Sequence, residues 1–541
     1  MTGPQALLLA AVAVPAVMLL GCVAPRLRGG MWQALWLAPL PGLAAALLAR
    51  GSSVSFGPAR AQFVLALDTS GAILLGSAAV LWIAAGVYAE RDMRSAANGG
   101  WFVVCWLATL TGCFGAFLIA DMPGFYLFLA VVSLGASGLI LQGNTPQARR
   151  ASGMYLAFAL FAETAILMGF VLLAAGTPGG SLLMHDAAAA LPTSPWRDPA
   201  LALLIFGLGT KAALVPLHVW MPLAYPNAPI SVAAVLSGAV VKVSIIGLIR
   251  VLPWGAAMPD WGAAMAAAGV FGAYYGVVVG LTQSDPKTIL AYSSVSQMGL
   301  LVAVLGMGLR AGDGGTAIAV ALAAAWHLLA KGGLFLAVGA SSGTTARRPW
   351  PVLLPAGVLA LGLGGLPFTG GAVAKLAIKG PLGDGMMATL VTLAAVGTTL
   401  LMLHFLRRLP ASAPTRAGEA PAGLTLPWLA IAFASIAIPW ALYSAVIGPV
   451  SDVLAPAALW AAFWPVLVGT LLAVGLRAWG PRLPPVPAGD LVVLGERAAS
   501  GVATWSVTLE RADAVLRLWP VAGLSLLAVA VALGAAMLSG R

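Results

Sequence analysis

The sequence predicts an all-α polytopic membrane protein with about 16 transmembrane helices. Of its 541 residues, 61% are hydrophobic and only 8% are charged, and the mean hydropathy is +0.98. A soluble domain carries charge on roughly a quarter of its residues, so most of this chain's surface must face lipid. Apolar stretches of about 20 residues, long enough to cross a ~30 Å hydrocarbon core, recur from end to end. Because backbone groups in lipid must be paired internally, these stretches are predicted to be helices.

The order of the spans agrees with the distribution of basic residues. Counted from the first span, the odd-numbered loops carry 17 Lys or Arg and the even-numbered loops carry 5. Positive residues accumulate on the cytoplasmic side, so the odd loops are predicted to be cytoplasmic and the N-terminus to lie outside. The predicted spans are 3–22, 32–49, 68–89, 99–120, 123–142, 152–176, 199–222, 228–252, 261–283, 288–309, 315–340, 352–380, 387–406, 424–447, 457–476 and 518–538.

One polar-leaning segment follows the fifteenth span. Residues near 490–515 mix Glu496 and Arg497 with Val502 and Trp505. This pattern is typical of an amphipathic helix on the cytoplasmic surface, and a solvated linker explains it equally well.

Two spans contain helix-breaking residues. Span 199–222 holds Pro216 next to His218, and span 352–380 holds a run of glycines around Pro367. Backbone groups freed by such breaks must line a cavity or be satisfied by neighbouring helices. Interrupted helices, one in each half of a transporter, commonly mark its ion path.

Lysine and arginine are distributed differently. All 22 arginines lie in predicted loops, at span ends or at the C-terminus, and Lys287 is the only lysine predicted in a loop. A charge at mid-bilayer costs ~2.5–3.5 kcal/mol on insertion scales. Arginine stays protonated in proteins, whereas a desolvated lysine can exchange its proton. Lysines inside spans are therefore interpreted as proton-exchanging groups, although snorkelling to the interface explains Lys379 equally well. The five lysines inside spans are Lys211, Lys242, Lys331, Lys375 and Lys379.

Three further side chains join this set. Glu163 is central in span 152–176, where it either pairs with a lysine or faces lipid in its neutral form. His327 and Lys331 are four residues apart and share a helix face, close enough to pass a proton. His218 lies beside the Pro216 break. We predict that Glu163, His218 and His327 belong to the ion path.

Several of these residues lie within recognisable motifs. The strings are GLGTKAALVPLHVWMP at 207–222, APIS at 228–231, SGAVVK at 237–242, DPKTILAYSSVSQMG at 285–299, HLLAK at 327–331 and GGAVAK at 370–375. Together they resemble the antiporter-like subunits of respiratory complex I, of Mrp-type cation/proton antiporters and of membrane-bound hydrogenases. The resemblance runs from about residue 65 to 410.

The resemblance implies two inverted five-helix repeats, each with a broken helix. The parts are then N-terminal helices 1–98, a first repeat 99–252, a second repeat 253–408 and C-terminal helices 409–541. By matching motif, Lys211 is similar to the central lysine of the first repeat and Lys242 to the connecting one. His327 and Lys331 resemble the link of the second repeat, and Lys375 resembles its terminal residue.

One position departs from the family pattern. The family usually carries a glutamate in its fifth helix, where this chain has Ala130. Glu163, on the next helix, is predicted to replace that counter-ion of Lys211; otherwise the coupling element is missing. Gln297 stands where many members have histidine.

The predicted function is translocation of H⁺, or Na⁺, by a subunit of a multisubunit assembly in the bacterial cytoplasmic (inner) membrane. The expected partners are other membrane subunits and the lipid bilayer. No cofactor and no nucleic-acid partner is expected, because no nucleotide, haem, iron–sulfur or metal motif occurs. Two alternatives stay open: a solute transporter that binds its substrate at the buried charges, and a non-pumping structural or inorganic-carbon-uptake partner with the same fold.

Overall fold

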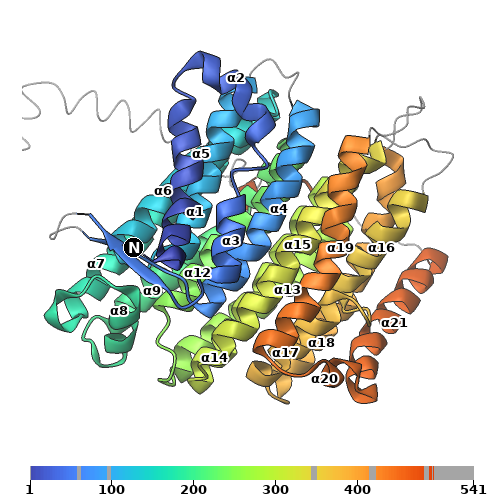
Figure 1. Ribbon diagram of the computed structural model, residues 1–541. Coiled ribbons are helices and arrows are strands. Elements are labelled where there is room, and N and C mark those ends of the chain that lie inside the picture. The colour runs from blue at the N-terminus through green and yellow to red at the C-terminus, as the bar shows by residue number, and fades with distance from the viewer. Residues whose placement is uncertain are drawn as a thin grey trace, which may run out of the picture. The chain divides into compact units, whose positions relative to one another are not determined.

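The protein is an integral membrane protein built almost entirely of helices (Figure 1). The structure, a computed structural model, describes residues 2–57, 62–93, 99–342, 350–412, 422–479, 486–489 and 491–492. Within these ranges, 12 helices are long and apolar enough to cross a membrane. Eleven are single helices, namely α1 (Gly3–Gly21), α4 (Thr69–Met93), α5 (Gly99–Leu118), α6 (Met122–Leu141), α7 (Pro146–Gly176), α13 (Pro259–Leu281), α14 (Pro286–Ala311), α15 (Thr316–Ser342), α18 (Met386–Arg408), α19 (Ala422–Val446) and α21 (Pro456–Trp479). The remaining one joins α11 (Ile230–Val235), the π-helical turn η3 (Leu236–Val240) and α12 (Lys242–Val251).

Three other predicted spans consist of shorter helices. Span 32–49 corresponds to α2 (Pro25–Ala34) and α3 (Leu40–Leu48), span 199–222 to α9 (Arg197–Lys211) and α10 (Trp220–Asn227), and span 352–380 to α16 (Trp350–Gly364) and α17 (Gly370–Leu382). The two predicted helix breaks are thus confirmed. Span 518–538 lies outside the described residues, as does nearly all of the segment near 490–515, so the count of sixteen stays a prediction.

The short elements lie in the connections between helices. They are the 3-10 turns η1 (Pro178–Gly180), η2 (Leu191–Thr193) and η4 (Leu409–Ser412), and the helices α8 (Met184–Ala190) and α20 (Val450–Leu454). The strands β1 (Ser53–Phe56) and β2 (Phe63–Ala66) form an antiparallel hairpin in which Ser53 pairs with Ala66. The sequence did not predict this hairpin, because four-residue strands show too little alternation to stand out beside apolar spans.

A buried carboxylate fastens this hairpin to the helices. Asp121 caps the N-terminus of α6, where Oδ1 accepts a 2.7 Å hydrogen bond from the Gly124 amide. Its Oδ2 accepts a 2.8 Å bond from the amide of Val64 in β2. One side chain therefore satisfies a helix end and a strand together.

We expect Asp121→Ala to lower stability by about 2 kcal/mol, because it removes a helix cap and leaves a buried amide without its acceptor. The unfolding midpoint of the purified protein in detergent, followed by circular dichroism, measures the loss. Asp121→Asn keeps one acceptor oxygen and should lose less. Equal midpoints for Asp121→Ala and the unchanged protein would contradict this account.

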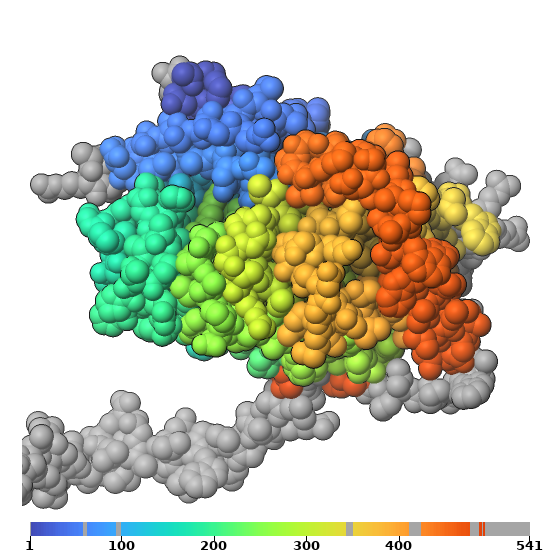
Figure 2. Space-filling view, turned by 90° about the horizontal axis from the view of Figure 1, so that it is seen from below, coloured from blue at the N-terminus to red at the C-terminus, as the bar shows by residue number. Residues whose placement is uncertain are grey.

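Burial separates the helices of residues 1–488, the first of two compact units, into an interior group and an outer group. The best apolar window is 100% buried in α11–α12 and in α14, and 94% buried in α15, but only 17% buried in α1 and in α21. Helix α15 packs against α4, α14, α17 and α19, and Figure 1 shows α4, α15 and α19 side by side. Figure 2, a view from below, shows the N-terminal helices in blue next to the orange segment that contains α19. Of these three most buried helices, α12 carries Lys242 and α15 carries His327 and Lys331. Residues 489–541 form the second unit, of which only residues 489, 491 and 492 are described.

Candidate functional site

The first part of the site is an ion pair between Lys211 and Glu163. Lys211 Nζ lies 2.7 Å from Glu163 Oε1 and donates a 2.5 Å hydrogen bond to Ser133 Oγ. The Ser133 hydroxyl also donates to Glu163 Oε1. The side chains of Lys211 and Glu163 are only 11% and 5% exposed. The three residues come from α9, α7 and α6, so the pair joins three helices in the protein interior.

The break after α9 positions the Lys211 amine. Lys211 is the last residue of α9, and Ala213 then adopts a left-handed backbone with φ 59°. The carbonyl of Thr210 accepts bonds from the Ala213 amide at 3.0 Å and from Trp220 Nε1 at 2.9 Å. The backbone at the break is therefore satisfied by protein groups, as a membrane interior requires. The negative end of the α9 dipole also favours a cation at this position.

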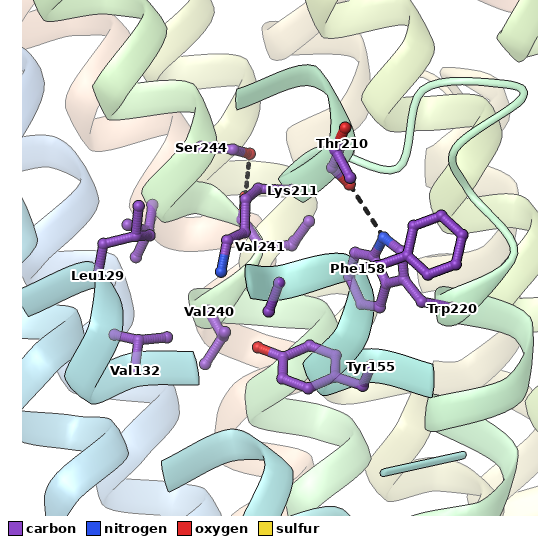
Figure 3. Close-up of a pocket in the computed structure, with 12 residues that line it drawn as sticks. Leu129, Val132, Tyr155, Phe158, Thr210, Lys211, Trp220, Val240, Val241 and Ser244 are labelled. Carbon is purple, nitrogen blue, oxygen red and sulfur yellow. Dashed lines mark hydrogen bonds between the residues drawn. The ribbon is translucent and has the colours of Figure 1, made fainter. Parts of the chain in front are cut away.

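A small cavity lies beside the Lys211 side chain (Figure 3). Its volume is about 20 Å³, enough for one water molecule. Val132 of α6, Tyr155 of α7, and Val240 and Val241 next to Lys242 are among the residues that line it. The cavity therefore lies between the Lys211 pair and the helix that carries the next lysine.

Lys242 follows the π-helical turn η3. In this turn the Val241 amide bonds to the Leu236 carbonyl, five residues back, at 3.2 Å, so the Ser237 carbonyl is released from its usual α-helical partner. Lys242 Nζ donates to this Ser237 carbonyl at 3.3 Å, and Lys242 is fully buried. π-Turns of this kind are frequent at functional sites. The sequence does not predict this turn, because one extra residue does not change the pattern of an apolar span.

Lys331 and His327 lie on one face of α15, as predicted from their spacing. Lys331 Nζ donates a 3.0 Å hydrogen bond to the Leu290 carbonyl of α14, and Lys331 is fully buried. His327 is 2% exposed, and neither of its ring nitrogens has a hydrogen-bond partner among the described residues. Lys242 is within electrostatic reach of both residues.

Lys375 stands at the second helix break. Its Nζ donates to the Gly364 carbonyl at the end of α16. Gly365 has φ 100°, and a Cβ there would come within 2.5 Å of Lys375 Nζ. Only glycine suits this position, because a side chain would strain the backbone and displace the amine.

A cavity of about 620 Å³ adjoins this break. His327, Gln297 and Lys375 contribute polar groups to its wall, and Lys379 and Asp384 lie where α17 ends. Residues of α18 and α21 supply much of the apolar lining. We call this space the α17 cavity. Both His327 and Lys375 line it, and it is large enough to contain many water molecules.

His218 lies in the break between α9 and α10. It is fully buried in the first break, and its ring packs edge-on against Tyr275 with centroids 4.9 Å apart. Its ring centroid is 6.2 Å from that of Tyr292. Its place in the ion path stays a prediction that rests on its position beside Pro216 in the sequence.

One expectation about the lysines is wrong. Lys287 was predicted in a loop, but it is the second residue of α14 and donates a 2.7 Å bond to the Ala228 carbonyl. The preceding Asp285 caps the helix by accepting from the Thr288 amide at 2.8 Å. An Asp followed by Pro is a strong helix start. Asp285 and Pro286 therefore indicate that the helix begins before Lys287.

Fold and site together define a polytopic membrane protein whose interior helices carry several buried lysines and a buried histidine. The sequence profile of the NADH:quinone oxidoreductase/Mrp antiporter transmembrane family matches residues 120–402. The chain belongs to this family.

Individual relatives agree with this assignment. The chain is 34% identical over 359 residues to NADH-quinone oxidoreductase subunit N of Desulforudis audaxviator, which covers 62% of this chain and 69% of that protein. It is 31% identical over 300 residues to hydrogenase-4 component B of Escherichia coli K12, covering 52% of this chain and 43% of that protein. The chain spans about half the length of the first curated relatives it matches.

A solved structure shares the fold. A chain from the structure of the Mrp complex of Dietzia sp. DQ12-45-1b superposes with a TM-score of 0.70. The superposition covers 88% of this chain and all of the other, at 23% sequence identity. At this identity the likeness concerns the fold alone.

Proposed function

We propose that this protein is a proton-translocating, antiporter-like subunit of a membrane assembly of the complex I, Mrp or hydrogenase type, in a bacterial cytoplasmic membrane. The observation that carries the proposal is the buried Lys211–Glu163 pair, which lies beside the helix that holds Lys242. The proposed path runs from Lys211 through Lys242, then His327 and Lys331, to Lys375.

The ion pair supplies a means of control. A carboxylate next to an amine favours the charged form of the amine. When Glu163 is close, Lys211 holds its proton, and separation of the two leaves a buried charge that is expensive to maintain. Lys211 then passes the proton on toward Lys242. The water-sized cavity beside Lys211 offers a place for the intermediate step.

The chemistry of the path favours protons over sodium ions. Hard cations such as Na⁺ take oxygen ligands, and the path consists of amines, imidazoles and one carboxylate. That carboxylate, Glu163, is already bonded to Lys211 and Ser133. Protonated amines would also repel a metal cation, whereas an amine that alternates between its charged and neutral forms can release and accept a proton.

The α17 cavity suits the last step. It brings Lys375 and His327 to one space that continues to the exposed residues Lys379 and Asp384. Water in this cavity would connect the terminal lysine to one side of the membrane. Together with the two helix breaks, this arrangement supports the division into inverted repeats at 99–252 and 253–408.

Partner subunits form part of the proposal. The relatives are named as a subunit or a component, and the superposed structure is that of a complex. The weakly buried helices α1 and α21 offer apolar faces to lipid or to other membrane subunits. The energy source lies in those subunits.

Lys331→Met tests this function. In sodium-free membrane vesicles that contain the assembled complex, we expect the substitution to lower proton uptake by about 100-fold or more, because the second repeat loses its exchanging group. A pH-sensitive fluorescent dye reports the uptake. Lys379→Met, at an exposed lysine that also lines the α17 cavity, should retain most activity. Normal uptake by Lys331→Met, or uptake that requires Na⁺, would refute the proposal.

A further inference from the structure

Besides His327, two serine hydroxyls lie close to both Lys242 and Lys331. Ser237 of η3 and Ser294 of α14 approach with their Oγ atoms 3.0 Å apart. Both residues are fully buried. Ser237 also provides the carbonyl that holds Lys242 Nζ, at 3.3 Å.

The other end of the pair reaches Lys331 through a shared acceptor. Ser294 Oγ donates to the Leu290 carbonyl at 2.9 Å, and Lys331 Nζ donates to the same oxygen at 3.0 Å. Leu290 lies inside α14, so this oxygen also accepts the backbone bond of the helix, and the two side chains share it with that bond. The Ser294 hydroxyl and the Lys331 amine therefore lie at most two hydrogen-bond lengths apart.

Because each hydroxyl has a single proton, the direction of the hydrogen bonds between these groups is fixed. Because Ser294 donates its proton to Leu290, Ser237 must be the donor in the bond between the two serines. The resting order is Ser237 to Ser294 to the Leu290 carbonyl. Ser237 Oγ keeps a free lone pair, on the residue whose carbonyl binds the Lys242 amine.

We propose that Ser237 and Ser294 form a hydroxyl relay that carries a proton from Lys242 to Lys331 and so joins the two halves of the path. This inference rests on the proposed function and assigns roles to two side chains that take no charge themselves. They act as positioning and relay groups between the two amines.

The step balances without any other reactant. The Lys242 ammonium gives a proton to Ser237 Oγ while Ser237 gives its own proton to Ser294 Oγ. Ser294, turned from the Leu290 carbonyl toward the neutral Lys331 amine, gives its proton to Nζ. One N–H bond breaks at Lys242 and one forms at Lys331, and each hydroxyl ends with one proton. Rotation of the two hydroxyls restores the resting order.

A packing role alone explains the serine pair less well than a relay does. Placing a hydroxyl in an apolar interior is unfavourable unless it is hydrogen-bonded, and alanine would fill a tight contact without that penalty. The neighbouring Ser293 gives a useful contrast. It is also buried on α14, but it faces α18, where its hydroxyl lies 4.0 Å from Met402 Sδ.

The test uses the assembled complex in membrane vesicles and compares Ser237→Ala, Ser294→Ala and the double variant with Ser293→Ala. Proton uptake is measured with a pH-sensitive dye in H₂O and in D₂O, and a native gel checks assembly. We expect the double variant to assemble normally and to take up protons about tenfold more slowly or worse. We also expect the ratio of its rates in H₂O and D₂O to differ from that of the unchanged protein, because the protons in flight have changed.

Two results would overturn the relay. One is uptake by the double variant as fast as by Ser293→Ala. The other is slower uptake with an unchanged isotope ratio, which indicates a packing defect. Lys242→Met, measured in parallel, separates the relay from the proposed function. If Lys242→Met takes up protons normally, the proton path itself is wrong and the relay fails with it; if only the serine variants are normal, the path stands without the relay.

Discussion

Replacing Lys211 by arginine is expected to stop proton translocation while the ion pair with Glu163 survives. Arginine keeps a positive charge and binds carboxylates well, but it does not release its proton in proteins. If Lys211 works by exchanging a proton, Lys211→Arg should lower proton uptake in vesicles about 100-fold or more. A role limited to charge would leave uptake close to normal.

Lys211→Met is the matched variant, since it removes the charge and keeps the length. It should also stop proton uptake. Its stability, however, should differ from that of Lys211→Arg. Methionine leaves Glu163 buried without its cation, and breaking a buried pair in this way costs about 3–5 kcal/mol. The unfolding midpoint in detergent should therefore fall for Lys211→Met and stay near normal for Lys211→Arg. Substantial uptake by either variant would show that Lys211 is not an exchanging group.

Single residues show how far the sequence predicts the path. An ionisable side chain in an apolar span stands out because its insertion is costly, so Lys242 and Lys331 were found from their depth alone. The breaks near Pro216 and Gly365 were found because these residue types interrupt helices in any context. These signals are local, and the structure has helix ends where they were expected.

What the sequence could not reveal depends on contacts between distant helices. Ser133 bonds to both Lys211 and Glu163, yet a lone serine in an apolar span can equally bond to its own helix backbone. The same applies to Ser237 and Ser294, which meet only because η3 lies against α14. Even the Glu163 pairing was one of two alternatives, since the span does not show which side of α7 faces protein.

The position of the carboxylate can be tested by moving it. Glu163→Gln is expected to lower proton uptake about 100-fold. The neutral amide cannot stabilise the protonated form of Lys211, so its approach and withdrawal no longer control whether Lys211 holds its proton. Ala130 is three residues from Ser133 on α6, so the two share a helix face, and Ser133 already touches Lys211. A glutamate at 130, where the family usually carries one, should therefore reach the same amine.

We thus expect the double variant Glu163→Gln/Ala130→Glu to recover a large part of the lost uptake. Glu163→Gln/Ala130→Gln is its matched control, equal in size but without the charge, and it should recover none. Recovery by the glutamate alone would mean that Lys211 needs one carboxylate within reach and that its helix of origin is secondary. The other outcome is that Glu163→Gln is inactive and neither double variant recovers proton uptake, although both assemble. The carboxylate must then lie on α7, and a carboxylate on α6 cannot replace it. Full activity of Glu163→Gln would instead remove the counter-ion from the mechanism and leave the lysines to work without it.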